Sequence, residues 1–134
     1  MTKEKILVVE DESIIAWDVK NRLNNLGYQV PSVITSAEEA IKKSEEIHPD
    51  LVLIDIKVKG KMDGIEAAKQ ISDRLNIPVI YITGYSDEDT LKRASLKKPF
   101  GYISKPFDDV ELDALILLTL NNHKLKSRTK KNKG

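Results

Sequence analysis

The chain has 134 residues, 40% of them apolar and 32% charged, which is enough for one globular domain with one core. It has no cysteine, no apolar run near the ~18 residues of a membrane span, and no signal-peptide core. We therefore expect a cytoplasmic protein without disulfides or membrane segments. All 21 acidic residues precede residue 114, and six of the 22 basic residues follow His123. The body of the chain, residues 1–123, therefore has 16 basic residues against 21 acidic ones and a net charge near −5. Such a body argues against direct nucleic-acid binding.

Apolar runs and helical patterns alternate five times along the chain. This alternation is typical of an α/β fold with a parallel sheet and right-handed crossovers. The first run predicts a strand at 5–9, and the pattern after it predicts a helix over 13–26. The run 29–34 predicts a weaker strand, which we expect at the edge of the sheet because Pro31 cannot donate a ladder hydrogen bond.

The middle of the chain continues the same alternation. Ser36 and Glu39 have the spacing of a capping box and predict the start of a second helix. A buried strand is predicted at 51–54, a third helix at 64–75 and a fourth strand at 79–83.

The last part of the chain predicts three more elements. A short polar helix is expected at about 87–97, a strand at 102–104 and a fifth helix from Asp108 or Asp109. Its apolar stripe would consist of Val110, Leu112, Leu115, Ile116 and Leu120. We interpret residues 1–123 as one domain and 124–134 as a basic, disordered tail or the start of a linker.

Chemically capable side chains follow four of the predicted strands. They are Glu10, Asp11, Asp55, Thr83 and Lys105. Since the carboxyl ends of parallel strands meet at one edge, three carboxylates, a hydroxyl and an ammonium should converge there. Oxygen-only ligands suit Mg²⁺, and a carboxylate can form an acyl phosphate, so the set predicts phosphoryl transfer.

Each of these residues also has a simpler interpretation when taken alone. An aspartate after a strand is often a helix cap or a turn residue, and acidic residues favour a helix N-terminus. Thr83 and Lys105 could likewise be turn or surface residues. The combination, in this order at four strand ends, favours the site.

With these residues in this order, the sequence resembles a response-regulator receiver domain of two-component signalling, similar to the chemotaxis-type single-domain receivers. The resemblance covers residues 4–123 and rests on ILVVEDE, PDLVLIDI, MDGIEAA, PVIYITGYSD and FGYISKPF. It implies a flavodoxin-like, doubly wound (βα)5 fold with a five-stranded parallel sheet in the order 2-1-3-4-5.

The resemblance also implies a role for each site residue. Asp55 would be the phosphorylated aspartate, and Glu10, Asp11 and the backbone carbonyl of Lys57 would join it in holding Mg²⁺ or Mn²⁺. The hydroxyl of Thr83 and the aromatic ring of Tyr102 would act as switches. Lys105 would pair with the phosphate. The Lys105–Pro106 bond would be cis.

By the same resemblance, the chain would take its phosphoryl group from a sensor histidine kinase or a phosphotransfer protein. Phosphorylation would change the surface of the fourth helix, fifth strand and fifth helix, and so control an output partner or module that the sequence does not identify. The protein would be no turnover enzyme, since it catalyses only its own phosphorylation and dephosphorylation. It would be a monomer or a phosphorylation-dependent dimer.

The alternatives are an aspartate-nucleophile phosphatase, a flavin-binding domain and a pseudo-receiver. An aspartate-nucleophile phosphatase of the haloacid dehalogenase kind needs a second aspartate where Lys57 stands. A flavin-binding domain needs a Ser/Thr/Gly-rich loop after the first strand, where EDESII stands. A pseudo-receiver that only binds partners stays open as an alternative.

The loop after Asp55 is among the places where the chain departs from the commonest receiver pattern. The loop IKVKGKMD after Asp55 is one residue longer than usual. We expect it to form a bulged or longer connection, in which Gly60 supplies the backbone freedom.

Overall fold

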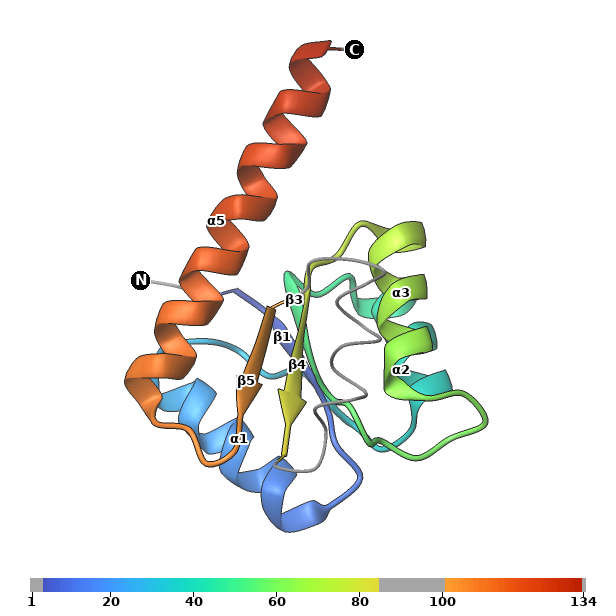
Figure 1. Cartoon of the computed structure of the whole chain (residues 1–134), viewed down its shortest axis with the longest axis vertical. Helices are drawn as coiled ribbons and strands as arrows, with labels where there is room; N and C mark the ends of the chain where they lie inside the picture. Colours follow the sequence, from blue (N-terminus) through green and yellow to red (C-terminus); the bar gives the residue numbers. More distant parts are fainter. Residues whose placement is uncertain (1–3, 85–100, 134) are drawn as a thin grey trace.

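A computed structural model describes the backbone of residues 4–84 and 101–133 (Figure 1). The predicted helix at 87–97 lies outside these described residues. The elements are β1 (Ile6–Val9), α1 (Ser13–Asn25), β2 (Val33–Ile34), α2 (Ala37–Ile47), β3 (Leu51–Asp55), α3 (Gly64–Leu75), β4 (Val79–Thr83), β5 (Gly101–Ser104) and α5 (Asp109–Lys133).

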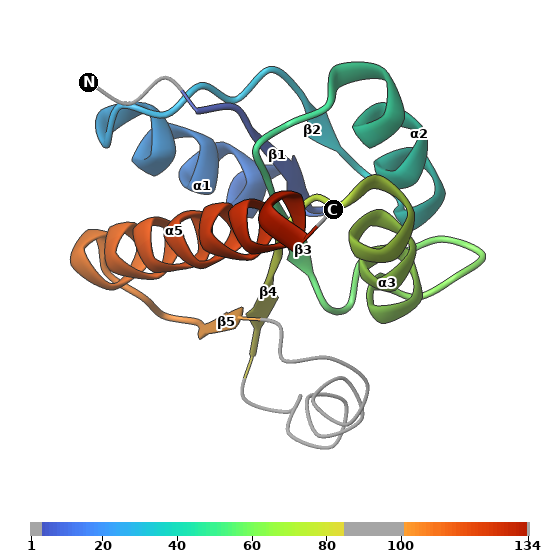
Figure 2. The same cartoon turned by 90° about the horizontal axis from the view of Figure 1, so that it is seen from above.

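The five strands form one parallel sheet in the order β2-β1-β3-β4-β5. Figure 2 shows α1 and α5 on one face of this sheet and α2 and α3 on the other. The predicted flavodoxin-like, doubly wound architecture and its strand order are therefore confirmed. β2 lies at an edge of the sheet, as the proline in its segment predicted.

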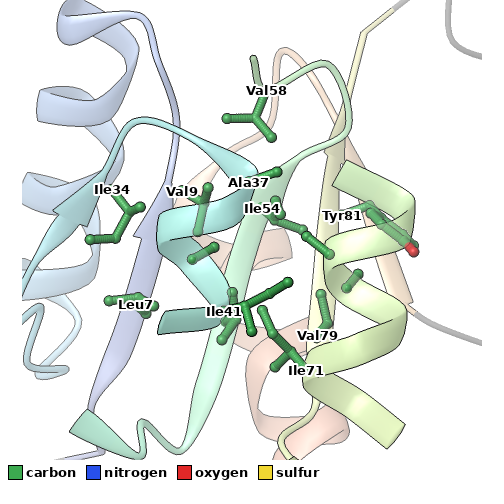
Figure 3. Packing of buried hydrophobic residues seen from close by; sticks show 14 of the residues in the cluster. Leu7, Val9, Ile34, Ala37, Ile41, Ile54, Val58, Ile71, Val79 and Tyr81 are labelled. Atoms are coloured by element: carbon green, nitrogen blue, oxygen red, sulfur yellow. The ribbon is translucent and has the colours of Figure 1, made fainter. Parts of the chain in front are cut away.

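Two hydrophobic clusters, one on each face, hold the helices to the sheet. Successive side chains along a strand point to opposite faces of the sheet, so a strand that is apolar throughout contributes to both clusters. The cluster under α2 and α3 includes Leu7, Val9, Ile41, Ile54, Ile71, Val79 and Tyr81 (Figure 3). The cluster under α1 and α5 includes Ile6, Val8, Val19, Leu23, Leu53, Ile80, Leu112 and Ile116.

Side-chain caps begin three of the helices. The hydroxyl of Ser36 accepts a hydrogen bond from the backbone N–H of Glu39, and Asp63 caps α3 in the same way. At α5, Asp108 accepts from the N–H of Glu111, whose carboxylate in turn accepts from the N–H of Asp108. These reciprocal bonds satisfy donors that a helix N-terminus leaves unpaired.

The structure corrects three expectations about bounds and faces. β2 is shorter than predicted, because Pro31 interrupts pairing between the isolated Lys5–Gln29 bridge and Val33. Val110 was expected to face the core, but its side chain is 78% exposed. It lies on the far side of α5 from the buried residues of that helix.

α5 continues through Lys133, in the segment for which the sequence predicted a disordered tail or the start of a linker. The helix differs from a disordered tail, and the linker interpretation stays a prediction. The segment contains no glycine or proline before Gly134, and basic side chains interact favourably with a helix C-terminus. Figure 1 shows this part of α5 extending past the end of the sheet. Among the described residues, no helix combines the length and apolarity that crossing a membrane requires.

Two polar contacts join α1 and its following turn to α5. Arg22 forms an ion pair with Asp109 at 2.7 Å, and the Tyr28 hydroxyl donates to Asp113 Oδ1 at 2.7 Å. Tyr28 is 3% exposed. Burial and the Asp113 carboxylate raise the pKa of Tyr28 well above its ordinary value.

We expect Tyr28→Phe to lower the free energy of unfolding by about 2 kcal/mol at neutral pH, because a hydrogen bond to a charged acceptor is lost. A raised phenol pKa contributes stability below the unfolded-state pKa of about 10, and that stability is lost as the pH rises further. The difference between wild type and variant should therefore shrink above about pH 10. Urea denaturation at neutral pH and above about pH 10 measures this difference in the free energy of unfolding. The control is Tyr102→Phe, which changes an exposed tyrosine. Equal stability at neutral pH would contradict the prediction.

Candidate functional site

The ends of β1 and β3 bring three carboxylates together. Val9 pairs with Ile54, so the next residues, Glu10 and Asp55, lie side by side at the edge of the sheet. Carboxylate oxygens of Glu10, Asp11 and Asp55 lie within 4.8 Å of one another. Glu10 is 1% exposed and Asp55 is 6% exposed, so solvent screens their mutual repulsion poorly.

Lys105 brings the positive charge to this cluster from the end of β5. Its Nζ lies 3.3 Å from Asp55 Oδ2 and 3.7 Å from Glu10 Oε1. Its backbone N–H donates to the Thr83 carbonyl at 2.8 Å, which ties the residue to the end of β4. The Lys105–Pro106 bond is cis, as the resemblance implied.

The two oxygens of Asp55 have different surroundings. Oδ1 accepts a hydrogen bond from the backbone N–H of Lys57 at 2.9 Å, whereas Oδ2 faces the ammonium of Lys105. Lys57 thus contacts the Asp55 carboxylate through its backbone N–H. A metal-binding role for its backbone carbonyl stays a prediction.

The surroundings of Glu10 favour the protonated form of its carboxyl group. Burial, together with the neighbouring Asp55 carboxylate, raises the pKa of Glu10 to about 8, although the Glu12 N–H and the Lys105 ammonium act in the opposite direction. Oε1 of Glu10 is buried and accepts no hydrogen bond from the described residues. A buried carboxylate with an unused oxygen, next to two more carboxylates, fits a hard divalent cation such as Mg²⁺ or Mn²⁺.

Thr83 directs its hydroxyl toward β5. The hydroxyl donates to the Ile103 carbonyl at 3.4 Å and lies 3.3 Å from the Ser104 hydroxyl. Thr83 pairs with Ser104 in the sheet, and Tyr102 lies two residues before Ser104. Because the side-chain period of a strand is two, Thr83 and Tyr102 lie on the same face, where Tyr102 is 51% exposed. Their switch roles stay predictions.

A solvent-accessible pocket of about 440 Å³ opens over the cluster. It brings in Lys59, which the sequence did not single out and whose only signal was its place in the loop after Asp55. The pocket is lined by Asp11, Glu12, Asp55, Lys57, Lys59, Gly84 and Lys105.

The long loop after Asp55 is attached to the start of α2. The Lys59 carbonyl accepts from the Ala37 N–H at 3.0 Å, and the Lys61 N–H donates to Glu38. Between them, Gly60 has φ 144°, and a Cβ there would collide with the Glu38 carboxylate. The expected need for glycine in this loop is therefore met by a backbone conformation that other residues rarely adopt.

Gly64, the first residue of α3, lies against the backbone that follows Asp55. A Cβ at Gly64 would lie 2.9 Å from the Asp55 carbonyl oxygen and 3.2 Å from that of Ile56. Both neighbours are backbone atoms, so one of the two segments would have to move. The close approach of α3 to the end of β3 therefore requires glycine.

We expect Gly64→Ala to lower the free energy of unfolding by about 1–3 kcal/mol, because it overpacks this contact. It should also displace Asp55 and slow any chemistry there. Chemical denaturation measures the first effect. The matched control is Gly101→Ala, whose new Cβ would lie at ordinary contact distance, 3.4 Å from the flexible Leu115 side chain and farther from Thr119 and Ile80. Equal losses in both variants would contradict the prediction.

The fold and this strand-end cluster define a known class of signalling domain. The family model of the response regulator receiver domain matches residues 6–117. The chain belongs to this family, as its motifs predicted.

Two curated relatives illustrate the match. The transcriptional regulatory protein PdtaR of Mycobacterium tuberculosis is 32% identical over 117 residues, which are 87% of this chain and 57% of PdtaR. The phyllosphere-induced regulator PhyR of Methylorubrum extorquens is 33% identical over 113 residues, 84% of this chain and 42% of PhyR. The chain thus spans about half the length of the curated relatives it matches.

Solved structures agree with this assignment. The signal receiver domain of a modulated diguanylate cyclase from Desulfovibrio desulfuricans G20 superposes with a TM-score of 0.87 at 34% identity, covering 93% of this chain and 99% of that one. NtrX from Brucella abortus matches with a TM-score of 0.86 at 27% identity, covering 97% of this chain and 29% of that one.

Proposed function

We propose that this receiver domain accepts a phosphoryl group on Asp55 from a histidine kinase or a phosphotransfer protein. The observation that carries the proposal is the Asp55 carboxylate, which lies within 4.8 Å of two other carboxylates and 3.3 Å from the Lys105 ammonium in an open pocket. Glu10, Asp11 and Asp55, with the carbonyl of Lys57, would hold Mg²⁺ or Mn²⁺. The bound cation supplies charge neutralisation at the carboxylates and the phosphoryl oxygens.

The chain's own residues position the reactants. An Asp55 carboxylate oxygen attacks the phosphorus of a phosphohistidine, an O–P bond forms as the P–N bond breaks, and the imidazole leaves with the electron pair. The Lys57 N–H orients the carboxylate, and Lys105 neutralises a phosphoryl oxygen as a point charge. Water later cleaves the acyl phosphate, so the chain acts on itself and turns over no separate substrate.

Phosphorylation would be transmitted through Thr83. A phosphoryl group adds roughly two negative charges and three acceptor oxygens beside the end of β4. To donate to one of them, the Thr83 hydroxyl must leave its contacts with Ile103 and Ser104. Tyr102, on the same face of the sheet, would then change position and alter the surface of β5 and α5.

The output is proposed to be a partner protein or a further module, controlled in the cytoplasm. The acidic body of the chain favours a protein partner over direct contact with nucleic acid. The regulators that it resembles are longer than this chain, so their output activities do not transfer to it.

The test is the intact mass of the chain after incubation with acetyl phosphate, with Mg²⁺ or with a chelator. We expect a gain of one phosphoryl group that requires Mg²⁺, since the repulsion between the carboxylates otherwise disfavours the reaction. A gain that the chelator leaves unchanged would contradict the metal assignment. No gain from acetyl phosphate or from a phosphorylated histidine protein would instead indicate a pseudo-receiver.

A further inference from the structure

The loop 56–63, between β3 and α3, begins at the candidate site. The Lys57 N–H donates to Asp55 Oδ1 at 2.9 Å, and the Val58 N–H donates to the Asp55 carbonyl at 3.0 Å. The side chain of Val58 is buried in the cluster under α2 and α3 (Figure 3). The end of β3 and the hydrophobic core therefore fix the first half of this loop.

The second half of the loop leaves the core and runs past the start of α2. Lys59, Gly60 and Lys61 are all exposed. Two residues of α2 hold their backbone: the Ala37 N–H donates to the Lys59 carbonyl at 3.0 Å, and the Glu38 carboxylate accepts from the Lys61 N–H. The contact from Glu38 is made by a side chain, so a substitution can remove it.

The Glu38 carboxylate fits closely against the loop. Oε1 accepts the hydrogen bond from Lys61, and Oε2 is buried and accepts none from the described residues. The carboxylate lies over Gly60, where a Cβ would collide with it. The Lys61 N–H lowers the pKa of Glu38 below its ordinary value, so the group is charged at neutral pH. A charged acceptor makes the stronger kind of hydrogen bond with a backbone N–H.

We propose that Glu38 is a positioning residue for the cation at the candidate site. By holding the loop at Lys61, it fixes the backbone of Lys57, whose N–H orients the Asp55 carboxylate and whose carbonyl would contact the cation. The inference rests on the proposed function, because it requires a cation among the three carboxylates of the site. Glu38 is not one of these carboxylates and acts through the loop.

The reason lies in the freedom of an exposed loop that contains glycine. Glycine has more conformations to lose than any other residue, and Gly60 has φ 144° in the folded chain. Without the contact from Glu38, more conformations open to the exposed half of the loop, which begins two residues after Lys57. Groups that orient the ligands of a metal commonly change its affinity about 10- to 100-fold when they are removed.

Calorimetric titration with Mg²⁺, without a phosphoryl donor, tests the inference on the full chain. We expect Glu38→Ala to raise the dissociation constant of Mg²⁺ about tenfold. Glu38→Gln removes the same charge but keeps an oxygen that can accept from the Lys61 N–H, so it should bind Mg²⁺ nearly as the wild type does. Equal weakening in both variants would show an effect of charge and contradict positioning through the hydrogen bond.

Two control variants separate positioning from other effects. Glu39→Ala changes the next residue of α2, which is exposed, and should leave the Mg²⁺ dissociation constant unchanged. Tyr28→Phe destabilises the fold through its contact with Asp113 on α5, and it should also leave Mg²⁺ binding unchanged. Weaker binding in Tyr28→Phe as large as that in Glu38→Ala would reduce the effect to lost stability and overturn the inference.

The kinetics of phosphorylation provide a second readout. In Glu38→Ala, the Mg²⁺ concentration for half-maximal mass gain from acetyl phosphate should rise with the dissociation constant. The rate at saturating Mg²⁺ should return close to that of the wild type, because Asp55 and Lys105 are unchanged. A wild type that binds Mg²⁺ no better than Glu38→Ala would overturn this inference alone. A wild type that binds no Mg²⁺ would instead overturn the proposed function on which it rests.

Discussion

Asp55→Asn is expected to abolish the Mg²⁺-dependent gain of a phosphoryl group. The amide keeps the size of the side chain, and its oxygen can still accept the hydrogen bond from the Lys57 N–H. The amide has no anionic oxygen to attack phosphorus, and the cluster of Glu10, Asp11 and Asp55 loses one of its three carboxylates. Intact mass after acetyl phosphate treatment measures the loss.

The control for this variant is Asp73→Asn, which changes an exposed aspartate of α3. The Asp73→Asn protein should gain a phosphoryl group on Asp55 as the wild type does. Stability provides a second check. Because the amide removes a negative charge from beside the buried Glu10, the thermal midpoint of Asp55→Asn should not fall. A phosphoryl gain that persists in Asp55→Asn would move the acceptor to another residue and contradict the proposed chemistry.

Lys105→Met is expected to slow phosphorylation by about a hundredfold, the usual cost of losing one preorganised group that stabilises a developing charge. The ammonium lies 3.3 Å from Asp55 Oδ2, where an incoming phosphoryl oxygen needs a positive charge. Methionine keeps most of the length of the side chain and removes only that charge. The initial rate of mass gain at a fixed acetyl phosphate concentration measures the effect.

Binding of Mg²⁺ to the same variant should change in the opposite direction. Lys105 places its charge between Glu10 and Asp55, so its removal leaves the carboxylates without a competing cation. We therefore expect a lower dissociation constant for Mg²⁺ by calorimetry, together with the slower reaction. Partial unfolding would weaken both properties, and it cannot produce this pair of results. Lys42→Met, an exposed lysine of α2, controls for the loss of net charge. A Lys105→Met protein that reacts at the wild-type rate would remove Lys105 from the mechanism.

Much of the fold could be predicted because its determinants are local. β4 and α3 begin and end where the sequence predicted, since a continuous apolar run defines a buried strand and caps define helix ends. The candidate site could be predicted as well, because the strand ends of a parallel sheet meet at one edge. The exposure of Val110 could not be predicted, because helical periodicity alone does not say which face another element covers. The helix at 124–133 was missed because its basic composition is typical of disordered tails, although no glycine or proline ends the helix before Gly134.

The sequence by itself determined the chemistry of this protein: which carboxylates, which hydroxyl and which lysine follow the strands, and in what order. Only the tertiary structure decided their state. Burial raises the pKa of Glu10, β5 holds the Thr83 hydroxyl, and Lys105 is positioned between two carboxylates. The physical reason is that the identity of a side chain is local, whereas its desolvation and its partners come from segments far away in the chain. Residue types therefore define the reaction this edge of the sheet can perform, and packing sets the charges with which it begins.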